Sequence, residues 1–359
     1  MPNAVIAGYS RSPFTIANKG DLKSLRPEDL LSQVINDLIK KSGINPEDIE
    51  DVIAGCAFPE GEQGFNICKV VTFMCDLPRN VAGMTVNRWC GSSMQSIHNA
   101  AGSIAMGSGK AFICAGVESM TRVPMLGFNP MPHPKLLEDN PNVYLSMGIT
   151  AENVAKKYNI TREDQDAFAL NSQKKTEEAI AKKKFDDELI KINQNGNILD
   201  KDEHPRVGLE IADLKKLKTV FKENGTVTPG NSSGINDGAA ALLLTTLEEA
   251  EKKSIKPLAK IVSWASVGID PALMGLGPIN AVREAIKKAK WNLNEIDLFE
   301  INEAFAAQSI AVIRELGIDQ NIVNVNGGAI ALGHPIGASG ARILVTLIHE
   351  LRRQNKNKG

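Results

Sequence analysis

The sequence predicts an α/β fold in which two similar βαβαβ halves carry helices on both faces of each sheet. Strand-like and helix-like segments alternate twice along the chain, and a segment that resembles neither half, residues 117–235, interrupts them. Such alternation favours mainly parallel sheets with right-handed connections. We therefore expect a first core half (1–116 with 236–256), an inserted loop domain (117–235) and a second core half (257–359).

The first half is predicted to alternate strands with three helices. A strand opens the chain, an amphipathic helix covers 28–42, and GINPEDIEDVIAGCAF supplies a turn and the next strand. A helix near 66–75, a strand in VAGMTVNRWC and a helix near 92–106 follow. The last helix repeats apolar residues at helical spacing, and the buried strand KAFICAGVE ends this half.

The second half repeats this order and then stops matching. Helices are expected at 280–290, 306–316 and 339–352, with strands in WNLNEIDLFEINEAF and NIVNVNGGAI. No counterpart of KAFICAGVE follows in the sequence, so we expect this half to miss its last strands. An unpaired sheet edge and an exposed Ile343–Leu347–Leu351 face should result. The insert is helical and lysine-rich, as is typical of a solvated helix face.

Composition excludes several classes of protein. Lys and Arg number 41 against 42 Asp and Glu, so no basic excess suggests a nucleic-acid partner. The longest apolar run, 239–247, is too short to span a membrane. Five unpatterned cysteines fit free thiols in a reducing compartment, and the N-terminus lacks the regions of a signal peptide. We expect a soluble, cytoplasmic protein.

Cys90 lies where the β-rich run 84–89 gives way to a helix that Ser92 and Ser93 are suited to cap. A thiol at a helix N-terminus is expected to have a lowered pKa and to act as a nucleophile. The alternative is a small buried apolar side chain, which suits the other four cysteines better.

His334 stands in the glycine-rich stretch NGGAIALGHPIGASGAR, a predicted strand-to-helix loop. The stretch is neither a Walker loop nor a dinucleotide fingerprint. The histidine could be purely structural, but the repeat places it and Cys90 in matching loops, where they would form a Cys–His pair of the acyl-transfer type. Asn302, in EINEAFAAQ, is either an oxyanion-hole donor or water holder, or a turn residue at a strand end.

Together these segments resemble the thiolase family of acetyl-CoA acyltransferases. VNRWCGSSMQ resembles its nucleophile motif, NEAFAAQ its Asn motif and GGAIALGHPIGASGAR its His motif; TVTPGNSSGINDGAAA and MGITAENVAKKYNITREDQDAFA resemble further signatures. The resemblance covers essentially the whole chain. It implies cleavage or formation of a carbon–carbon bond in 3-oxoacyl-CoA, with CoA as substrate, no metal or other cofactor, and a homodimer.

The resemblance also implies individual roles. Cys90 would accept the acyl group, His334 would deprotonate it, and Asn302 would hold a water in the oxyanion hole. Matches to CoA- and substrate-binding positions are Ser233, Gly234 and Ile235 along pantetheine, Ala304 and Phe305 in the pocket wall, Arg206 near the nucleotide, Phe221 near the adenine, and Met147 in the loop covering the acyl pocket.

Two departures qualify the match. Ser146 stands where the biosynthetic branch commonly has His, which favours the degradative branch. The family's second catalytic cysteine, in a Cys-x-Gly motif after the last helix, has no match up to Gly359. The alternative to an active enzyme is therefore a catalytically impaired, thiolase-like protein that binds CoA or pairs with a complete subunit.

Overall fold

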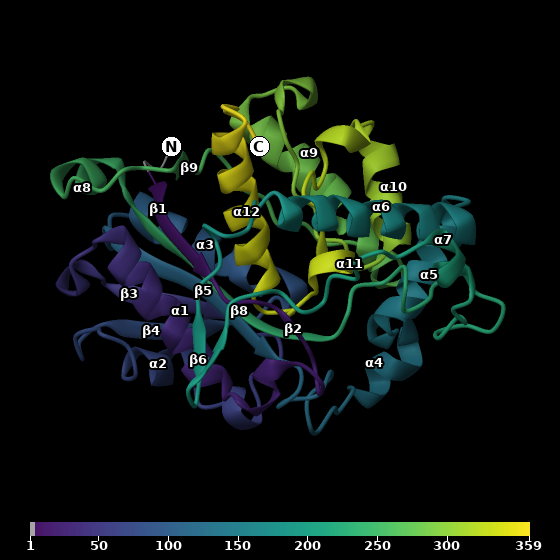
Figure 1. The fold of residues 1–359 in the computed structure, drawn as a ribbon, viewed down its shortest axis with the longest axis horizontal. Helices are drawn as coiled ribbons and strands as arrows, with labels where there is room; N and C mark the ends of the chain where they lie inside the picture. Colours follow the sequence, from purple (N-terminus) through teal and green to yellow (C-terminus); the bar gives the residue numbers. More distant parts are fainter. Residues whose placement is uncertain (1–3) are drawn as a thin grey trace.

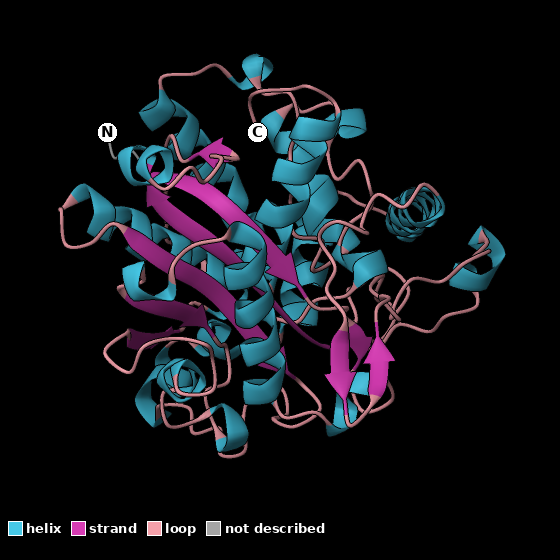
Figure 2. Ribbon diagram, turned by 60° about the vertical axis from the view of Figure 1, so that its left-hand side comes forward, coloured by secondary structure: helices cyan, strands magenta, loops and turns pink. Residues whose placement is uncertain are grey.

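The centre of the molecule is a mixed seven-stranded sheet, seen in a computed structural model that describes residues 4–359 (Figures 1 and 2). Residues 1–3 of the predicted first half lie outside this range. The strand order is β4-β3-β5-β8-β1-β9, with β2 beside β8. Their bounds are β1 Ala4–Arg11, β2 Thr15–Ile16, β3 Asp51–Gly55, β4 Ala82–Val86, β5 Ala111–Ser119, β8 Asn236–Thr246 and β9 Ala259–Lys260.

The predicted α/β class is confirmed, but the first sheet is mixed rather than mainly parallel. Only β3 pairs in parallel, with β4 and with β5, whereas β8 lies antiparallel between β5 and β1. The reason is that the inserted segment leaves and re-enters the sheet at one end, where Ser119 lies opposite Asp237. The returning strand must therefore run in the opposite direction.

Helices from both halves cover the sheet. α1 (Pro27–Ser42) and α2 (Ile67–Thr72) pack on one face; α3 (Ser92–Ala105) and α12 (Ser339–Arg353) pack on the other (Figure 1). Since successive side chains of a strand point to opposite faces, β8 contributes to both layers of the core. Ala239, Ala241 and Leu243 join the α1 side, and Ala240, Leu242 and Leu244 join the α3 and α12 side.

The remaining helices lie in the insert and the second half. The insert contains α4 (Pro134–Asp139), α5 (Met147–Lys157), α6 (Arg162–Ala181), the β6–β7 hairpin (Ile192–Gln194, Asn197–Leu199) and α7 (Ile211–Lys215). After β8 come α8 (Leu247–Lys252), α9 (Gly277–Ala289), α10 (Ala306–Leu316) and α11 (Ala329–Leu332). No helix within residues 4–359 combines the length and apolarity needed to cross a membrane.

The two strands predicted between α9 and α12 are reduced to one parallel bridge, Phe299 with Val323. The Asn324 side chain explains why the ladder stops, because its amide accepts from Ile301 N–H and donates to Ile301 C=O, both at 2.8 Å. A side chain thus takes the place of a main-chain partner. The first segment of this half, β9, instead extends the first sheet by pairing with β1.

A groove of about 730 Å³ opens between residues 256–264 and helices α9 and α12. Leu344, Leu347 and Leu351 of α12 line it. Ile343, Leu347 and Leu351 are partly buried, so the predicted exposed apolar face is wrong; Gly359 lies against Leu347 and Leu351 and covers part of it.

Candidate active site

Cys90 lies in a single turn of 3-10 helix, Trp89–Gly91, between β4 and α3. Trp89 has a φ of +47°, and its N–H donates to Asn87 Oδ1 at 2.9 Å. Ser92 Oγ donates to Trp89 C=O at 2.6 Å and accepts from Arg88 N–H at 2.9 Å. The predicted strand-to-helix junction is confirmed, and these bonds fix the shape of the turn that carries the thiol.

The thiol's pKa differs from the expectation for a helix N-terminus. Burial raises the pKa of Cys90 to about 11, and the charge of Glu118 adds to the rise. Loss of hydration outweighs the main-chain hydrogen bond that favours thiolate. The other thiols are raised further by burial: the pKa of Cys68 and of Cys75 reaches about 12, and those of Cys56 and Cys114 are also well above the ordinary range.

The N-terminal turns of α3 and α12 meet. The prediction that Ser92 and Ser93 cap α3 is wrong, because no side chain caps this helix. Ser93 Oγ instead accepts from the Ala341 N–H in the first turn of α12, at 2.9 Å. A Cβ on Gly340 would lie 2.4 Å from Met94 N, so only glycine permits this approach. The contact brings together the two loops that the repeat predicted to be neighbours.

His334 is buried and hydrogen-bonded on both ring nitrogens. Ser339 Oγ donates to Pro335 C=O at 2.9 Å and lies 2.5 Å from His334 Nδ1. Because the hydroxyl hydrogen is already used, Nδ1 carries the proton and donates to Ser339. This leaves Nε2 as the acceptor, 3.3 Å from Asn302 Nδ2. The bond from Ser339 to Pro335 favours the tautomer that a base acting through Nε2 requires.

Electrostatics keeps this imidazole neutral. Burial, with a contribution from Arg342, lowers the pKa of His334 to about 4. The histidine is therefore uncharged at neutral pH, and one of its ring nitrogens carries a free electron pair. The other polar atom of its neighbour, Asn302 Oδ1, is buried and has no hydrogen-bond partner within residues 4–359, which leaves it free for a water or a substrate group.

The segment 233–235 lies beside Ala304 and Phe305, which follow Asn302 in the chain. Ser233 N–H donates to Ala304 C=O at 2.9 Å, and an antiparallel bridge joins Ser232 to Phe305. A Cβ on Gly234 would lie 2.2 Å from the buried ring of His204. Ile235 is about half exposed. The predicted pantetheine and pocket-wall residues are thus neighbours.

Phe221 joins this group through its ring. It packs edge-on against Phe305 with ring centres 6.0 Å apart, and it covers Gly148, next to Met147. Phe221 and Met147 are both about 39% exposed, so they are accessible to a ligand. Arg206 is exposed, and its guanidinium makes no hydrogen bond or ion pair in the described part of the chain; only its N–H is held, by Gln173 Oε1.

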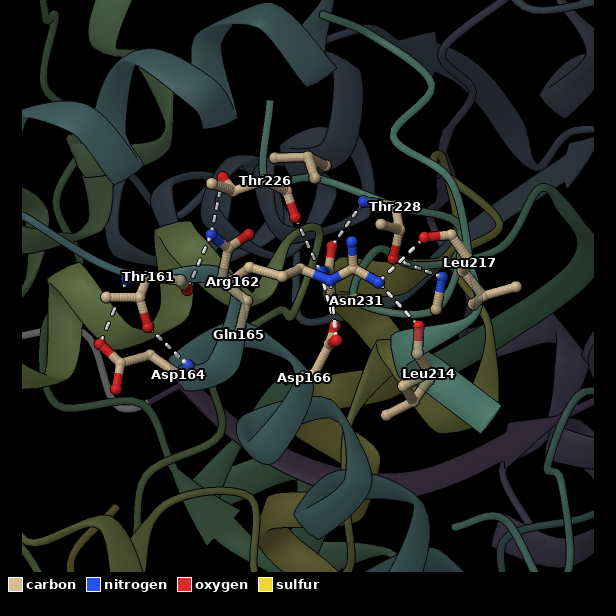
Figure 3. A network of polar contacts seen from close by, with 12 residues as sticks. Thr161, Arg162, Asp164, Gln165, Asp166, Leu214, Leu217, Thr226, Thr228 and Asn231 are labelled. Carbon is tan, nitrogen blue, oxygen red and sulfur yellow. Dashed lines mark hydrogen bonds and ion pairs between the residues drawn. The ribbon is translucent and has the colours of Figure 1, made fainter. Parts of the chain in front are cut away.

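A polar network supports the loop before Ser233 (Figure 3). Asp166 accepts from Arg162 Nε at 2.7 Å and from Asn231 Nδ2 at 2.9 Å. Arg162 also donates to the C=O groups of Leu214 and Leu217, in and after α7. Helices α6 and α7 are thereby tied to the loop.

Sequence reasoning missed three residues that surround these groups. Ser339 Oγ lies against His334 Nδ1, Asn236 Oδ1 accepts from the main-chain N–H of His334 at 2.9 Å, and Glu118 accepts from the N–H groups of Ala57 and Gly337. The sequence could have pointed to Glu118, because it is a charged residue near the end of the apolar run AFICAGVES. Among residues 4–359, no three His, Cys, Asp or Glu side chains are placed to hold a metal ion.

The fold and the facing Cys and His loops are typical of enzymes that carry acyl groups as thioesters. The chain belongs to the thiolase family: its residues 4–248 match the family model "Thiolase, N-terminal domain" and residues 255–359 match "Thiolase, C-terminal domain". It is an acyltransferase of the thiolase type, as the resemblance predicted.

Relatives of known name support this placement. The chain is 44% identical over 372 residues to 3-ketoacyl-CoA thiolase of Bacillus subtilis, covering 100% of this chain and 95% of that protein. It is 45% identical over 377 residues to acetyl-CoA acetyltransferase of Pseudomonas aeruginosa, with the same coverage. The human mitochondrial 3-ketoacyl-CoA thiolase structure in complex with CoA superimposes with a TM-score of 0.91 at 37% identity, covering 98% of this chain and 92% of that one. These names favour the enzyme over the impaired, CoA-binding alternative.

Proposed function

We propose that this chain catalyses the cleavage of 3-oxoacyl-CoA by CoA, or the reverse condensation of acyl-CoA with acetyl-CoA, through a thioester on Cys90. The observation that carries the proposal is the neutral His334, whose Nε2 is left as a proton acceptor in a loop that packs against the start of the Cys90 helix.

In the first step His334 Nε2 takes the proton of the Cys90 thiol. The thiolate attacks the 3-oxo carbon, and the bond between this carbon and the α-carbon breaks. Its electron pair goes to the α-carbon, which takes up a proton and leaves in acetyl-CoA; this proton balances the one lost by Cys90. In the second step the sulfur of CoA attacks the Cys90 thioester and the bond from Cys90 Sγ to the acyl carbon breaks. Cys90 takes up the proton that the CoA thiol loses, and the shortened acyl-CoA leaves.

The raised pKa of Cys90 makes the base necessary. With a pKa of about 11 only a small fraction of the thiol ionises at neutral pH, so transfer to a neighbouring base lowers the barrier. Asn302 is suited to hold a water that donates to the thioester oxygen, because its amide is bonded to His334 on one side only.

Binding of CoA is assigned to the residues gathered around 233–235. Ser233, Gly234 and Ile235 would line pantetheine, and Ala304 and Phe305 the pocket wall. Phe221 would meet the adenine, Arg206 the phosphorylated nucleotide and Met147 the acyl group. The similarity to a thiolase structure that contains CoA supports this assignment.

Several attributes complete the proposal. The similarity to 3-ketoacyl-CoA thiolases supports a place in fatty-acid β-oxidation. We infer a cytoplasmic homodimer that needs no metal or other cofactor and has no nucleic-acid partner. The three-part division at 116, 235 and 256 is part of the same proposal.

Steady-state thiolysis of a 3-oxoacyl-CoA by CoA tests the function. We expect turnover in the wild-type protein and a loss to background in Cys90→Ala. Turnover that survives in Cys90→Ala would refute the thioester route.

A further inference from the structure

We propose that Glu118, which no step above uses, is the positioning residue that holds the loop packed beside the nucleophile, residues 57–58, and the base loop at a fixed separation. It lies one residue before the end of β5, with 0% of its surface exposed. The inference rests on the proposed acyl transfer, since it concerns the nucleophile and the base of that reaction.

One oxygen of Glu118 joins two loops from different halves of the chain. Oε2 accepts from Ala57 N–H, in the loop after β3, at 2.8 Å. It also accepts from Gly337 N–H, three residues after His334, at 2.8 Å. A single atom therefore sets the distance between these two main-chain segments.

The second oxygen fixes the carboxylate itself. Oε1 accepts from Gln63 Nε2 at 2.8 Å and from Phe58 N–H at 3.2 Å. Gln63 Oε1 in turn accepts from Ser119 N–H at 2.6 Å, which ties the group back to β5. Burial raises the pKa of Glu118, while the four N–H donors around it act in the opposite direction and favour the ionised form.

Close main-chain packing makes this arrangement rigid. A Cβ on Gly116, two residues before Glu118, would lie 2.2 Å from Gly337 C=O. Strand β5 therefore runs directly against the loop that follows His334. A shift of Glu118 would have to move this loop as well.

The bonded loops form the surroundings of Cys90. Its side chain packs against an apolar cluster that includes Ala57, Phe58 and Ile336. Glu118 bonds the first two directly, and Ile336 adjoins the bonded Gly337. Displacing Glu118 would thus move both the walls around the thiol and the loop of its base.

The charge of Glu118 also acts on the thiol and provides a second readout, because it raises the pKa of Cys90. The other titratable groups around it are Cys56, whose Sγ lies 3.7 Å from Oε1, and His334 on the far side of Gly337. Asp237, on the neighbouring strand β8, lies opposite Ser119 and accepts from Thr121 N–H at 2.9 Å. Burial raises the pKa of Cys56 well above its ordinary range, so it stays a thiol.

The test compares Glu118→Gln with Glu152→Gln. Glu152 is a matched control because it is similarly buried and accepts main-chain hydrogen bonds, at Thr226 and Val227, away from Cys90. Two quantities are measured: kcat with KM for CoA, and the rate at which iodoacetamide alkylates Cys90 as a function of pH.

In Glu118→Gln an amide NH₂ must face two N–H donors, so the loops move apart. We expect kcat to fall about 10- to 100-fold with KM for CoA changed by less than about twofold. Removing the charge should also shift the alkylation midpoint to lower pH. Glu152→Gln should leave that midpoint unchanged. A kcat within about threefold of wild type, or an unmoved midpoint, overturns the proposal.

A second variant covers the case in which Glu118→Gln does not fold. Gln63→Leu keeps the Glu118 charge but removes the bond from Gln63 Nε2 to Glu118 and the bond that ties Gln63 to Ser119 N–H, so kcat should fall severalfold while the alkylation midpoint stays. An unchanged kcat in Gln63→Leu overturns the positioning role. If the wild type itself fails to cleave 3-oxoacyl-CoA, the proposed function fails, whereas the alkylation midpoint still decides whether Glu118 acts on Cys90.

Discussion

Asn302 Nδ2 lies 3.3 Å from His334 Nε2, although the two residues come from separate loops of the second half. The histidine is oriented from its other side by Ser339, and the amide oxygen of Asn302 has no partner among residues 4–359. One pair of side chains therefore presents both a proton acceptor and an open polar atom at the place where the Cys90 loop packs.

Replacing Asn302 by Ala should lower kcat about 10²- to 10³-fold, the range observed when one oxyanion-hole contact is lost. Stability should change little, because the amide makes one long hydrogen bond. Steady-state kinetics and a melting curve check both statements. Asn321→Ala, at an exposed position in the same half, is the control and should behave as wild type. An unimpaired Asn302→Ala enzyme would contradict the role given to the amide.

Much of the fold could be predicted because the local spacing of apolar residues indicates where the helices lie. α10 has its expected bounds, Ala306–Leu316, and α12 ends one residue beyond its predicted limit. The strands before and after α10 could not be rejected from sequence, because an Asn324 side chain replaces a ladder partner only once the chain has folded. Pattern locates elements but does not identify which side chain will take a main-chain hydrogen bond.

The candidate site shows the same division. The junction that carries Cys90 follows from its flanking strand and helix, whereas the raised pKa of its thiol depends on burial by distant segments. Serine is a common helix-capping residue, but the Ser93 hydroxyl accepts from the main-chain N–H of Ala341, 248 residues away. Glu118 is one carboxylate among many in the sequence, and only tertiary structure surrounds it with four N–H donors.

The buried histidines should make stability fall as the pH is lowered from about 6.5 to about 4, whereas Glu300, whose pKa burial raises to about 8, acts in the opposite direction. Burial lowers the pKa of His98, His204 and His334 from 6.5 to about 4 in the folded protein. Between these values the unfolded chain binds protons that the folded chain does not. Each histidine therefore removes up to about 1.4 kcal/mol of unfolding free energy per pH unit.

Urea unfolding at a series of pH values checks this effect. His98→Asn should flatten the dependence between pH 6.5 and 4 without touching the catalytic groups, since His98 lies against Trp264 in the groove. Near pH 8 His98 is neutral in both the folded and the unfolded chain, so wild type and His98→Asn should show the same pH dependence there. A His98→Asn variant with the same pH dependence as the wild type between pH 6.5 and 4 would contradict a buried, neutral His98.

The network in Figure 3 should act on CoA binding more than on chemistry. Asn231→Ala removes the bond to Asp166 and the acceptor of Thr228 N–H, which loosens the loop that leads to Ser233. We expect KM for CoA to rise roughly 10-fold with a smaller change in kcat. Arg314→Ala, which breaks an exposed ion pair between α10 and Asp164 of α6, is the control and should leave KM unchanged. Equal effects of the two variants would contradict the link to the loop.

Trapping of the acyl group tests the account most directly. The protein is mixed with acetyl-CoA, quenched in acid and digested, and the five cysteine-containing positions are mapped by mass spectrometry. We predict an acetyl adduct on Cys90 alone, lost in Cys90→Ala and strongly reduced in His334→Asn. An adduct on Cys56, Cys68, Cys75 or Cys114, or acylation that persists without Cys90, would contradict the central claim.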